Sequence, residues 1–178
     1  MVSALNEIDW STWEPGIRAT LLFVVRDDQV LLIRKKRGLG AGKVNGPGGK
    51  LDPGESPRAC AIRETREEVG VLARGVQEAG VLRFEFVDGL RLLCTVFRAD
   101  DADGDPHETA EAAPFWAPID ALPFDEMWAD DRLWLPALLA RQPIKLWALF
   151  EGDRMLDSRV EVGSVAEDSG ITQTHHHE

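Results

Sequence analysis

The segment Gly49–Val71 constrains the fold of this 178-residue chain more tightly than any other. Within it, the sequence predicts a helix over Pro57–Val69. Ser56 is a preferred N-cap residue, proline is favoured at the first helical position, and Gly70 is suited to end the helix. A run dense in glycine precedes these residues. The segment is therefore expected to fold as a glycine-rich loop followed by a capped helix.

Three glutamates of the predicted helix share one face. Glu64, Glu67 and Glu68 stand at spacing i, i+3 and i+4. Like charges at this spacing each cost about 0.2–0.5 kcal/mol in an isolated helix, so the face repels itself until a cation binds. Carboxylate oxygens suit hard divalent cations such as Mg²⁺ or Mn²⁺. A solvated acidic helix face would show the same spacing, so the spacing alone leaves both interpretations open.

Arg63 lies next to these glutamates in the sequence. Its guanidinium has two available partners. It can pair with Glu67 at i+4, or it can fold back to Glu55 and brace the loop before the helix. Both pairings remain open from the sequence.

The composition limits the class of partner. The chain has 20 basic and 31 acidic residues, a formal net charge of −11. An acidic surface disfavours a nucleic-acid strand, whose phosphate backbone binds Lys and Arg, but a cation can neutralise the phosphates of a single nucleotide. The two cysteines, Cys60 and Cys94, exclude a disulfide scaffold and a cysteine-rich metal site. We therefore expect a small-molecule partner.

No targeting or membrane segment is visible. The longest apolar run, Ala19–Val25, is far too short to span a bilayer. The first ten residues contain Glu7 and Asp9 and no basic stretch typical of a signal peptide. The expectation is a cytoplasmic protein that does not bind membranes.

The chain is predicted to contain one domain with an extension at each end: residues 1–16 form an N-terminal extension, 17–162 the domain and 163–178 a flexible tail. The extension, with Trp10 and Trp13, either packs over the domain or caps its pocket. A second helix is expected over 131–141 and a loop over 99–113. Strands are expected over 17–25, 30–33, 79–87, 90–98, 114–119, 144–150 and 155–162. Strands with only two helices indicate a mixed sheet clasped by helices.

The segment Gly49–Val71 also carries a longer pattern. It has Gly49, Glu55, Arg63-Glu64, Glu67-Glu68 and Gly70-Val71 at fixed intervals. This pattern resembles the Nudix hydrolase box, with Thr65 where an aliphatic residue is usual. The resemblance implies an α/β (α+β) fold, the Nudix α/β/α sandwich with a mixed β-sheet, the box helix and a second C-terminal helix. It also implies Mg²⁺, or alternatively Mn²⁺, as the cofactor and hydrolysis of nucleoside diphosphates linked to another group.

The similarity continues outside the box. It covers residues 18 to about 162 and resembles members of the family that hydrolyse oxidised purine nucleoside triphosphates such as 8-oxo-dGTP. The matching segments are 35–43, Asn45-Gly46, Gly48–Lys50, Phe84–Val87, 119–124 and Met127–Asp131, with Trp134 and Pro136. The implied reaction releases a nucleoside monophosphate and pyrophosphate, a role in sanitising the nucleotide pool and preventing DNA damage.

The resemblance also implies roles for individual residues. The metal ligands would be Gly48, through its carbonyl, Glu64, Glu67, Glu68 and Glu111. The catalytic residues would be Glu67, Glu64, Glu111 and Arg63, with either Glu67 or Glu111 as the general base. The substrate-binding residues would be Thr20, Lys35, Asn45, Phe84, Met127, Trp128, Asp130 and Asp131.

The residue types suit a purine site. A base stacked on an aromatic ring such as Trp128 gains roughly 1–3 kcal/mol. Asp130 and Asp131 in one pocket cannot both ionise cheaply, so one neutral and one ionised carboxyl would offer a donor and acceptors to the base. The alternative is structural: Asp130 caps the second helix and Trp128 belongs to the core. The rim is less aromatic than in those relatives, because Leu39 and Pro47 replace aromatic residues and Leu92 a methionine.

Two other functions stay open. One is a different Nudix substrate: a dinucleoside polyphosphate, ADP-ribose or an RNA 5′ end. The chain has no tyrosine, which disfavours the first two, and its acidic surface disfavours RNA. The other is a non-catalytic module that only binds nucleotide, which the intact glutamates argue against. The sequence does not distinguish a monomer from a homodimer.

Overall fold

The structure is a computed structural model that describes residues 1–165. It contains two α-helices, α1 (Pro57–Val69) and α2 (Asp131–Leu139), and two short 3-10 helices, η1 (Leu5–Glu7) and η2 (Phe124–Glu126). Its strands are β1 (Ile17–Arg26), β2 (Gln29–Lys35), β3 (Val44–Asn45), β4 (Gly48–Lys50), β5 (Leu72–Arg74), β6 (Gln77–Phe86), β7 (Arg91–Ala99), β8 (Asp101–Asp103), β9 (Ala112–Pro118), β10 (Ile144–Glu151) and β11 (Arg154–Val162). Most of the predicted tail, from residue 166 on, lies outside the described residues.

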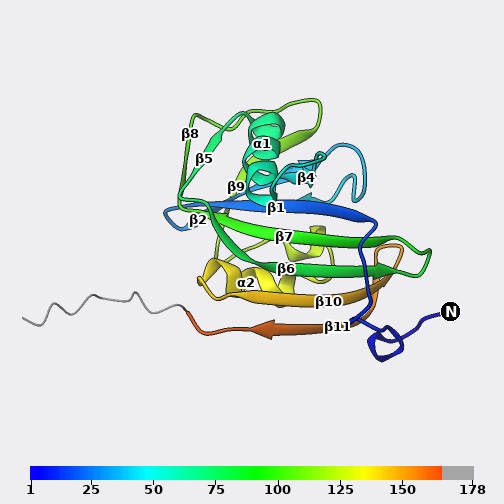
Figure 1. The fold of residues 1–178 in the computed structure, drawn as a ribbon. Coiled ribbons are helices and arrows are strands. Elements are labelled where there is room, and N and C mark those ends of the chain that lie inside the picture. The colour runs from blue at the N-terminus through cyan, green and yellow to red at the C-terminus, as the bar shows by residue number, and fades with distance from the viewer. Residues whose placement is uncertain (166–178) are drawn as a thin grey trace, which may run out of the picture.

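Nine strands form one mixed sheet in the order β11-β10-β6-β7-β1-β2-β3, with β4 beside β1 and β9 beside β2. The β1–β7 and β6–β10 pairs are parallel, and the other pairs in this sheet are antiparallel. Helix α1 lies on the β1 side of the molecule and α2 beside β10 (Figure 1). This arrangement confirms the predicted α/β fold with a mixed sheet and two helices.

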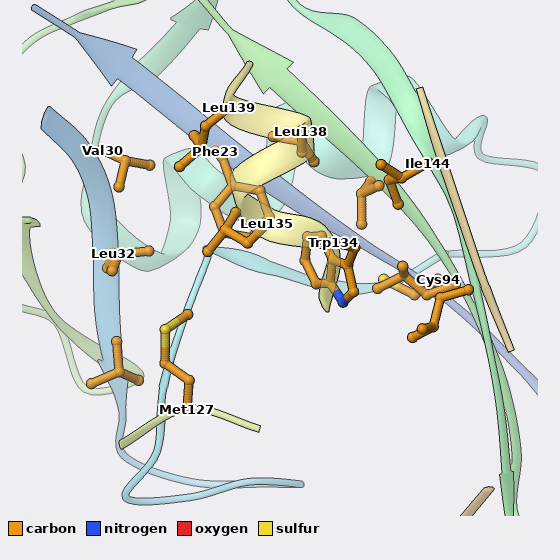
Figure 2. Close-up of a cluster of buried hydrophobic side chains, with 14 of the residues drawn as sticks. Phe23, Val30, Leu32, Cys94, Met127, Trp134, Leu135, Leu138, Leu139 and Ile144 are labelled. Carbon is orange, nitrogen blue, oxygen red and sulfur yellow. The ribbon is translucent and has the colours of Figure 1, made fainter. Parts of the chain in front are cut away.

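Two apolar clusters form the core. The larger lies between α2 and the sheet, where the ring centroids of Phe23 and Trp134 are 5.8 Å apart, and Leu135 and Leu138 flank them (Figure 2). The smaller joins α1 to the other side of β1 and β2, through residues such as Val69 and Leu22. Each helix is thus fixed by its own cluster. No helix within residues 1–165 is long and apolar enough to cross a membrane.

The prediction that all of residues 99–113 form a loop is wrong, because β8 forms within this segment and pairs with β5. Its acidic residues are tolerated in a strand because arginines neutralise them: Arg26 binds Asp101 at 3.0 Å, and Arg74 pairs with Asp103. Strands β3, β4 and β5 were not predicted either. They have only two or three residues each, and long-range backbone pairing forms them.

Candidate active site

Local signals define the helix that carries the glutamates. The Ser56 hydroxyl accepts a hydrogen bond from the Ala59 amide at 3.1 Å, and Gly70 ends the helix at φ +77°. Both are the expected capping interactions. Thr65 is fully buried, and its hydroxyl donates to the Ala61 carbonyl at 2.8 Å, so the departure from an aliphatic residue leaves no polar atom unpaired. Helix α1 therefore has the predicted bounds.

The backbone of β4 approaches the glutamates closely. A Cβ at Gly49 would lie 2.4 Å from the Glu64 carboxyl carbon, and a Cβ at Gly48 would lie 1.9 Å from the Thr20 carbonyl oxygen. Side chains at these two positions would force the strand or the helix to move. Glycine is thus needed at Gly49 so that the β4 backbone can lie against the acidic face of α1, and at Gly48 so that β4 can lie against β1.

Arg63 pairs with several carboxylates at once. It makes a bidentate pair with Glu55 at 2.7 and 2.8 Å, and it also binds Glu64 at 2.9 Å and Glu67 at 3.1 Å. Both pairings left open by the sequence are therefore present. The Arg63 hydrogen bonds hold the pKa of Glu55 at about 2, below its usual 4.5. Arg63 braces the loop and positions two glutamates of the face.

Glu68 differs from its neighbours because it is buried and has no cationic partner within residues 1–165. Within residues 1–165 the one hydrogen bond to its carboxylate comes from the Gly48 amide at 3.4 Å. Burial, and then the charge of Glu64, raise the pKa of Glu68 to about 8. Burial also raises the pKa of Glu64. Both carboxylates would become easier to ionise if a cation lay against them.

The donor set suits a hard divalent cation. It consists of carboxylate oxygens from Glu64, Glu67 and Glu68 and the nearby Gly48 carbonyl, the oxygen ligands that Mg²⁺ prefers. Within residues 1–165, no three acidic, His or Cys side chains are already gathered closely enough to hold a metal ion. Within residues 1–165 Arg63 binds two of the glutamates, while buried Glu68 forms no salt bridge and has only the more distant charge of Lys35 nearby. The residues therefore fit a metal by chemistry, because Glu64 and Glu67 each use one carboxylate oxygen for Arg63 and keep the other for a cation.

The loop before β9 is fixed to the end of α1. The Thr109 hydroxyl donates to the Glu68 carbonyl at 2.7 Å, and the His107 amide donates to the Val69 carbonyl at 3.0 Å. These contacts satisfy the last carbonyls of the helix. Glu111, on the same loop, is exposed and pairs with Arg37 at 2.9 Å. Its charge also contributes to the raised pKa of Glu68, so Glu111 lies near the acidic face of α1.

A cavity of about 430 Å³ extends from Glu68 and the β4 backbone to the start of α2. This volume falls in the range usual for small-molecule sites. The acidic face of α1 thus borders this largely apolar pocket through Glu68, while Glu64 and Glu67 do not line it. The lining residues are Ile17, Ala19, Thr20, Leu21, Ile33, Lys35, Gly38, Leu39, Asn45, Gly46, Gly48, Gly49, Lys50, Glu68, Leu82, Phe84, Phe86, Leu90, Leu92, Cys94, Trp128, Asp130 and Asp131.

Asp130 and Asp131 line this pocket and are 1% and 3% exposed. Asp130 accepts a hydrogen bond from the Trp134 indole at 2.8 Å. One oxygen of each carboxyl is buried without a hydrogen-bond partner within residues 1–165. Asp130 makes no side-chain capping bond to α2, so the helix-cap alternative is wrong. Two adjacent carboxyls with unsatisfied oxygens therefore face the cavity.

The protonation of this pair is set by burial. Burial raises the pKa of Asp130 from 3.8 to about 6. Burial and the neighbouring Asp130 charge raise the pKa of Asp131 well above 3.8. Because both pKa values are raised and the two carboxyls are adjacent, the pair shares a proton, and the Trp134 N–H, which donates to Asp130 alone, favours the negative charge on Asp130. The pair can accept hydrogen bonds from one ligand atom and donate to another.

An aromatic cluster forms one wall of the pocket. The Trp128 ring lies 5.5 Å from the Phe150 ring, which in turn lies 5.7 Å from Phe86 and 5.9 Å from Phe84. Lys43 lies over the Trp128 ring at 5.4 Å. Phe84, Phe86 and Trp128 line the cavity, so the wall offers flat apolar surface to a ligand.

The structure brings most of the predicted substrate residues into this cavity: Thr20, Lys35, Asn45, Phe84, Trp128, Asp130 and Asp131. Met127 is a correction, because it is 4% exposed, packs in the larger core cluster and does not line the cavity. Phe86 was missed. Its signal was available, because side chains two residues apart on a strand share a face, and Phe84 was already assigned.

Comparisons with known proteins agree with this geometry. The NUDIX domain model matches residues 16–138. The chain is 43% identical over 134 residues to "Oxidized purine nucleoside triphosphate hydrolase" of Danio rerio, covering 75% of this chain and 86% of the relative. It is 41% identical over 124 residues to the protein of the same name in Mus musculus, covering 69% and 80%.

A solved structure shares the same fold. The crystal structure of a MutT protein from Bacillus halodurans superposes with a TM-score of 0.72 at 26% sequence identity. The match covers 82% of this chain and 97% of that chain. The domain model spans more than half of the chain, and the box glutamates lie within its bounds. The chain therefore belongs to the NUDIX domain family.

Proposed function

We propose that this protein hydrolyses oxidised or otherwise modified purine nucleoside triphosphates to nucleoside monophosphate and pyrophosphate, with Mg²⁺ as cofactor. The observation that carries the proposal is the Asp130–Asp131 pair, two buried carboxyls with unsatisfied oxygens in a pocket continuous with the acidic face of α1. The relatives named oxidized purine nucleoside triphosphate hydrolases support the same substrate class.

The pocket can recognise a purine edge by hydrogen bonding. Ionised Asp130 accepts from ring and exocyclic N–H groups, and neutral Asp131 donates to a carbonyl oxygen. The Asn45 side-chain oxygen is already bound to the Gly46 amide at 2.9 Å, so its NH₂ group is left to donate to the base. Trp128 and Phe84 supply apolar surface for the ring. A modified purine is discriminated through these polar contacts.

The acidic face of α1 handles the phosphates. Glu64, Glu67 and Glu68, with the Gly48 carbonyl and Glu111, would hold the metal. When bound there, Mg²⁺ would offset phosphate charge and lower the pKa of an attacking water. Either Glu67 or Glu111 would take the proton of the attacking water as the new P–O bond forms and the bridging P–O bond breaks.

Arg63 does not act on the substrate in this proposal. Its bidentate pair with Glu55 fixes the guanidinium, which then positions Glu64 and Glu67. Base selection and hydrolysis are assigned to different ends of the cavity. Its apolar end selects the base, and its acidic end carries out the hydrolysis.

The test is pyrophosphate release with Mg²⁺ across a nucleotide panel. The panel compares 8-oxo-dGTP, 2-oxo-dATP, O6-methyl-dGTP, dGTP, ATP, diadenosine tetraphosphate and ADP-ribose by kcat/KM. We expect a modified purine triphosphate to exceed dGTP and ATP by at least tenfold, about 1.4 kcal/mol of transition-state discrimination. Equal or absent activity on the triphosphates, or preference for a dinucleotide or ADP-ribose, would overturn the proposal.

A further inference from the structure

Four residues form a row across one end of the sheet. Arg91 of β7 pairs in register with Glu85 of β6, Glu85 with Leu149 of β10, and Leu149 with Asp157 of β11. Directly paired residues of neighbouring strands point to the same face. The row therefore marks a line across four strands on a single face of the sheet.

The N-terminal extension crosses this row. The Gly16 amide donates to the Arg91 carbonyl at 3.0 Å, the Trp13 indole donates to Glu85 at 2.8 Å, and the Leu5 amide donates to Asp157 at 2.8 Å. Figure 1 shows the N-terminal segment running from the start of β1 across β7, β6 and β10 towards β11. The extension is thus bound at both edges of the row and near its middle.

The row is buried at its centre. Glu85 is 7% exposed and pairs with Arg91 at 2.9 Å, and Leu149 is fully buried although it belongs to neither core cluster. No residue of the extension lines the cavity. Of the two roles left open by the sequence, packing over the domain is therefore confirmed, and capping the pocket is wrong.

The opposite face of the same strands carries the aromatic wall. Glu85 lies between Phe84 and Phe86 in the sequence, and Leu149 precedes Phe150. Since side chains alternate along a strand, these three phenylalanines point away from the extension, where they contact one another and Trp128. The extension and the pocket wall thus lie on two faces of one short stretch of sheet.

We propose that residues 1–16 are a strap that holds the aromatic wall of the nucleotide pocket in place from behind, with Trp13 as its positioning residue. The proposal rests on the proposed function only for the identity of the ligand. Loss of the Trp13 N–H removes one of the two side-chain partners of buried Glu85, and the strand between Phe84 and Phe86 loosens. Base binding weakens because small displacements of positioning surfaces reduce binding steeply.

The experiment compares Trp13→Phe with Trp10→Phe. Phenylalanine keeps an aromatic ring at either position but removes the indole N–H. Within residues 1–165 the Trp10 indole donates no hydrogen bond, although its ring lies 5.4 Å from that of Trp13, so Trp10→Phe is a matched control. With 8-oxo-dGTP and Mg²⁺, we expect Trp13→Phe to raise KM about five- to tenfold and to change kcat less than twofold. Trp10→Phe should change neither by more than twofold.

Hydrogen exchange of the free protein gives a readout that needs no substrate. Amides of residues 84–92 should exchange at least fivefold faster in Trp13→Phe than in Trp10→Phe, while those of α1 are unchanged. Faster exchange without any activity on 8-oxo-dGTP in the parent chain would support the strap and contradict the proposed substrate. Unchanged KM and unchanged exchange in a folded Trp13→Phe variant would overturn the strap.

Asp157→Ala provides a second variant at the far edge of the row. It removes the acceptor of the Leu5 amide on the edge strand β11 and leaves the wall untouched. We expect faster exchange at residues 84–92 and a KM about twice that of the parent. If Trp13→Phe does not fold, Asp157→Ala is the test of the strap. Hydrogen exchange and KM equal to those of the parent protein would then overturn the proposal.

Discussion

Glu68, from the acidic face of α1, lines one end of the cavity and Asp130 and Asp131 line the other, and these two acidic groups differ in what balances their charge. On α1, Arg63 binds Glu55, Glu64 and Glu67 in a partly exposed setting. At the other end, Asp130 and Asp131 are buried without a cationic partner within residues 1–165. The pKa of Glu55 falls to about 2, whereas that of Asp130 rises to about 6.

This difference separates two uses of a carboxyl group. Arg63 holds Glu64 and Glu67 through one carboxylate oxygen each, so the other oxygen of each can bind a cation. Burial without a cation instead leaves the aspartate pair sharing a proton, so that it presents both a donor and an acceptor. In the proposed function, similar side chains would therefore hold a metal beside the phosphates at one end and a base at the other.

The largest expected effect comes from changing a glutamate on the acidic face of α1. Glu67→Gln removes a charge from an exposed side chain, so the fold is not disturbed. We expect kcat to fall about 10²–10⁴-fold, the range typical of a lost general base, with Tm unchanged. Glu78→Gln, exposed on β6, is the control and should retain parent kinetics. Parent-like turnover in Glu67→Gln would contradict the role given to this end.

The second largest effect is expected from changing the Asp130–Asp131 pair. Asp130→Asn can still accept the Trp134 hydrogen bond but cannot ionise. We expect kcat/KM for 8-oxo-dGTP to fall about 100-fold, close to 3 kcal/mol, because the base loses an anionic acceptor. Asp131→Asn should cost less, about tenfold or below, because an amide can still donate. A larger loss in Asp131→Asn would show that the proton assignment is reversed.

A smaller effect tests the role of Arg63. In Arg63→Gln, we expect kcat to fall about tenfold because Glu64 and Glu67 lose their positioning contact. The folded-state pKa of Glu55 lies below its unfolded value near 4.5, so its stabilisation is present above that value and is lost as pH falls towards 2. Chemical denaturation of the parent across this window should show the loss, and Arg63→Gln should not.

The smallest expected effect is on the free energy of unfolding and its pH dependence. The folded-state pKa of Asp130 lies above its unfolded value near 3.8, so its neutral form favours folding at low pH and this advantage is lost as pH rises through about 6. Asp130→Asn should therefore be more stable than the parent at pH 8 and nearly equal to it at pH 4. Equal unfolding free energies at pH 8 would refute the buried anion.

Much of the fold was predictable because its signals are local. The caps of α1 and the Asp88-Gly89 turn between β6 and β7 depend on residues that are close in sequence. Strands β4 and β8 were missed because their pairing depends on distant partners, β1 and β5. Met127 was assigned by resemblance, but it packs in the larger core cluster and does not line the cavity, which depends on how the side chain is oriented in the folded protein.

The sequence by itself determined the acidic face of α1, because a helical period of 3.6 residues brings Glu64, Glu67 and Glu68 together whatever surrounds them. Only the tertiary structure decided the state of Asp130 and Asp131. Their charges depend on burial, and burial requires β1, β7 and the aromatic wall to close around them. The same holds for the strap, whose contacts join residues 5–16 to strands up to 152 positions away.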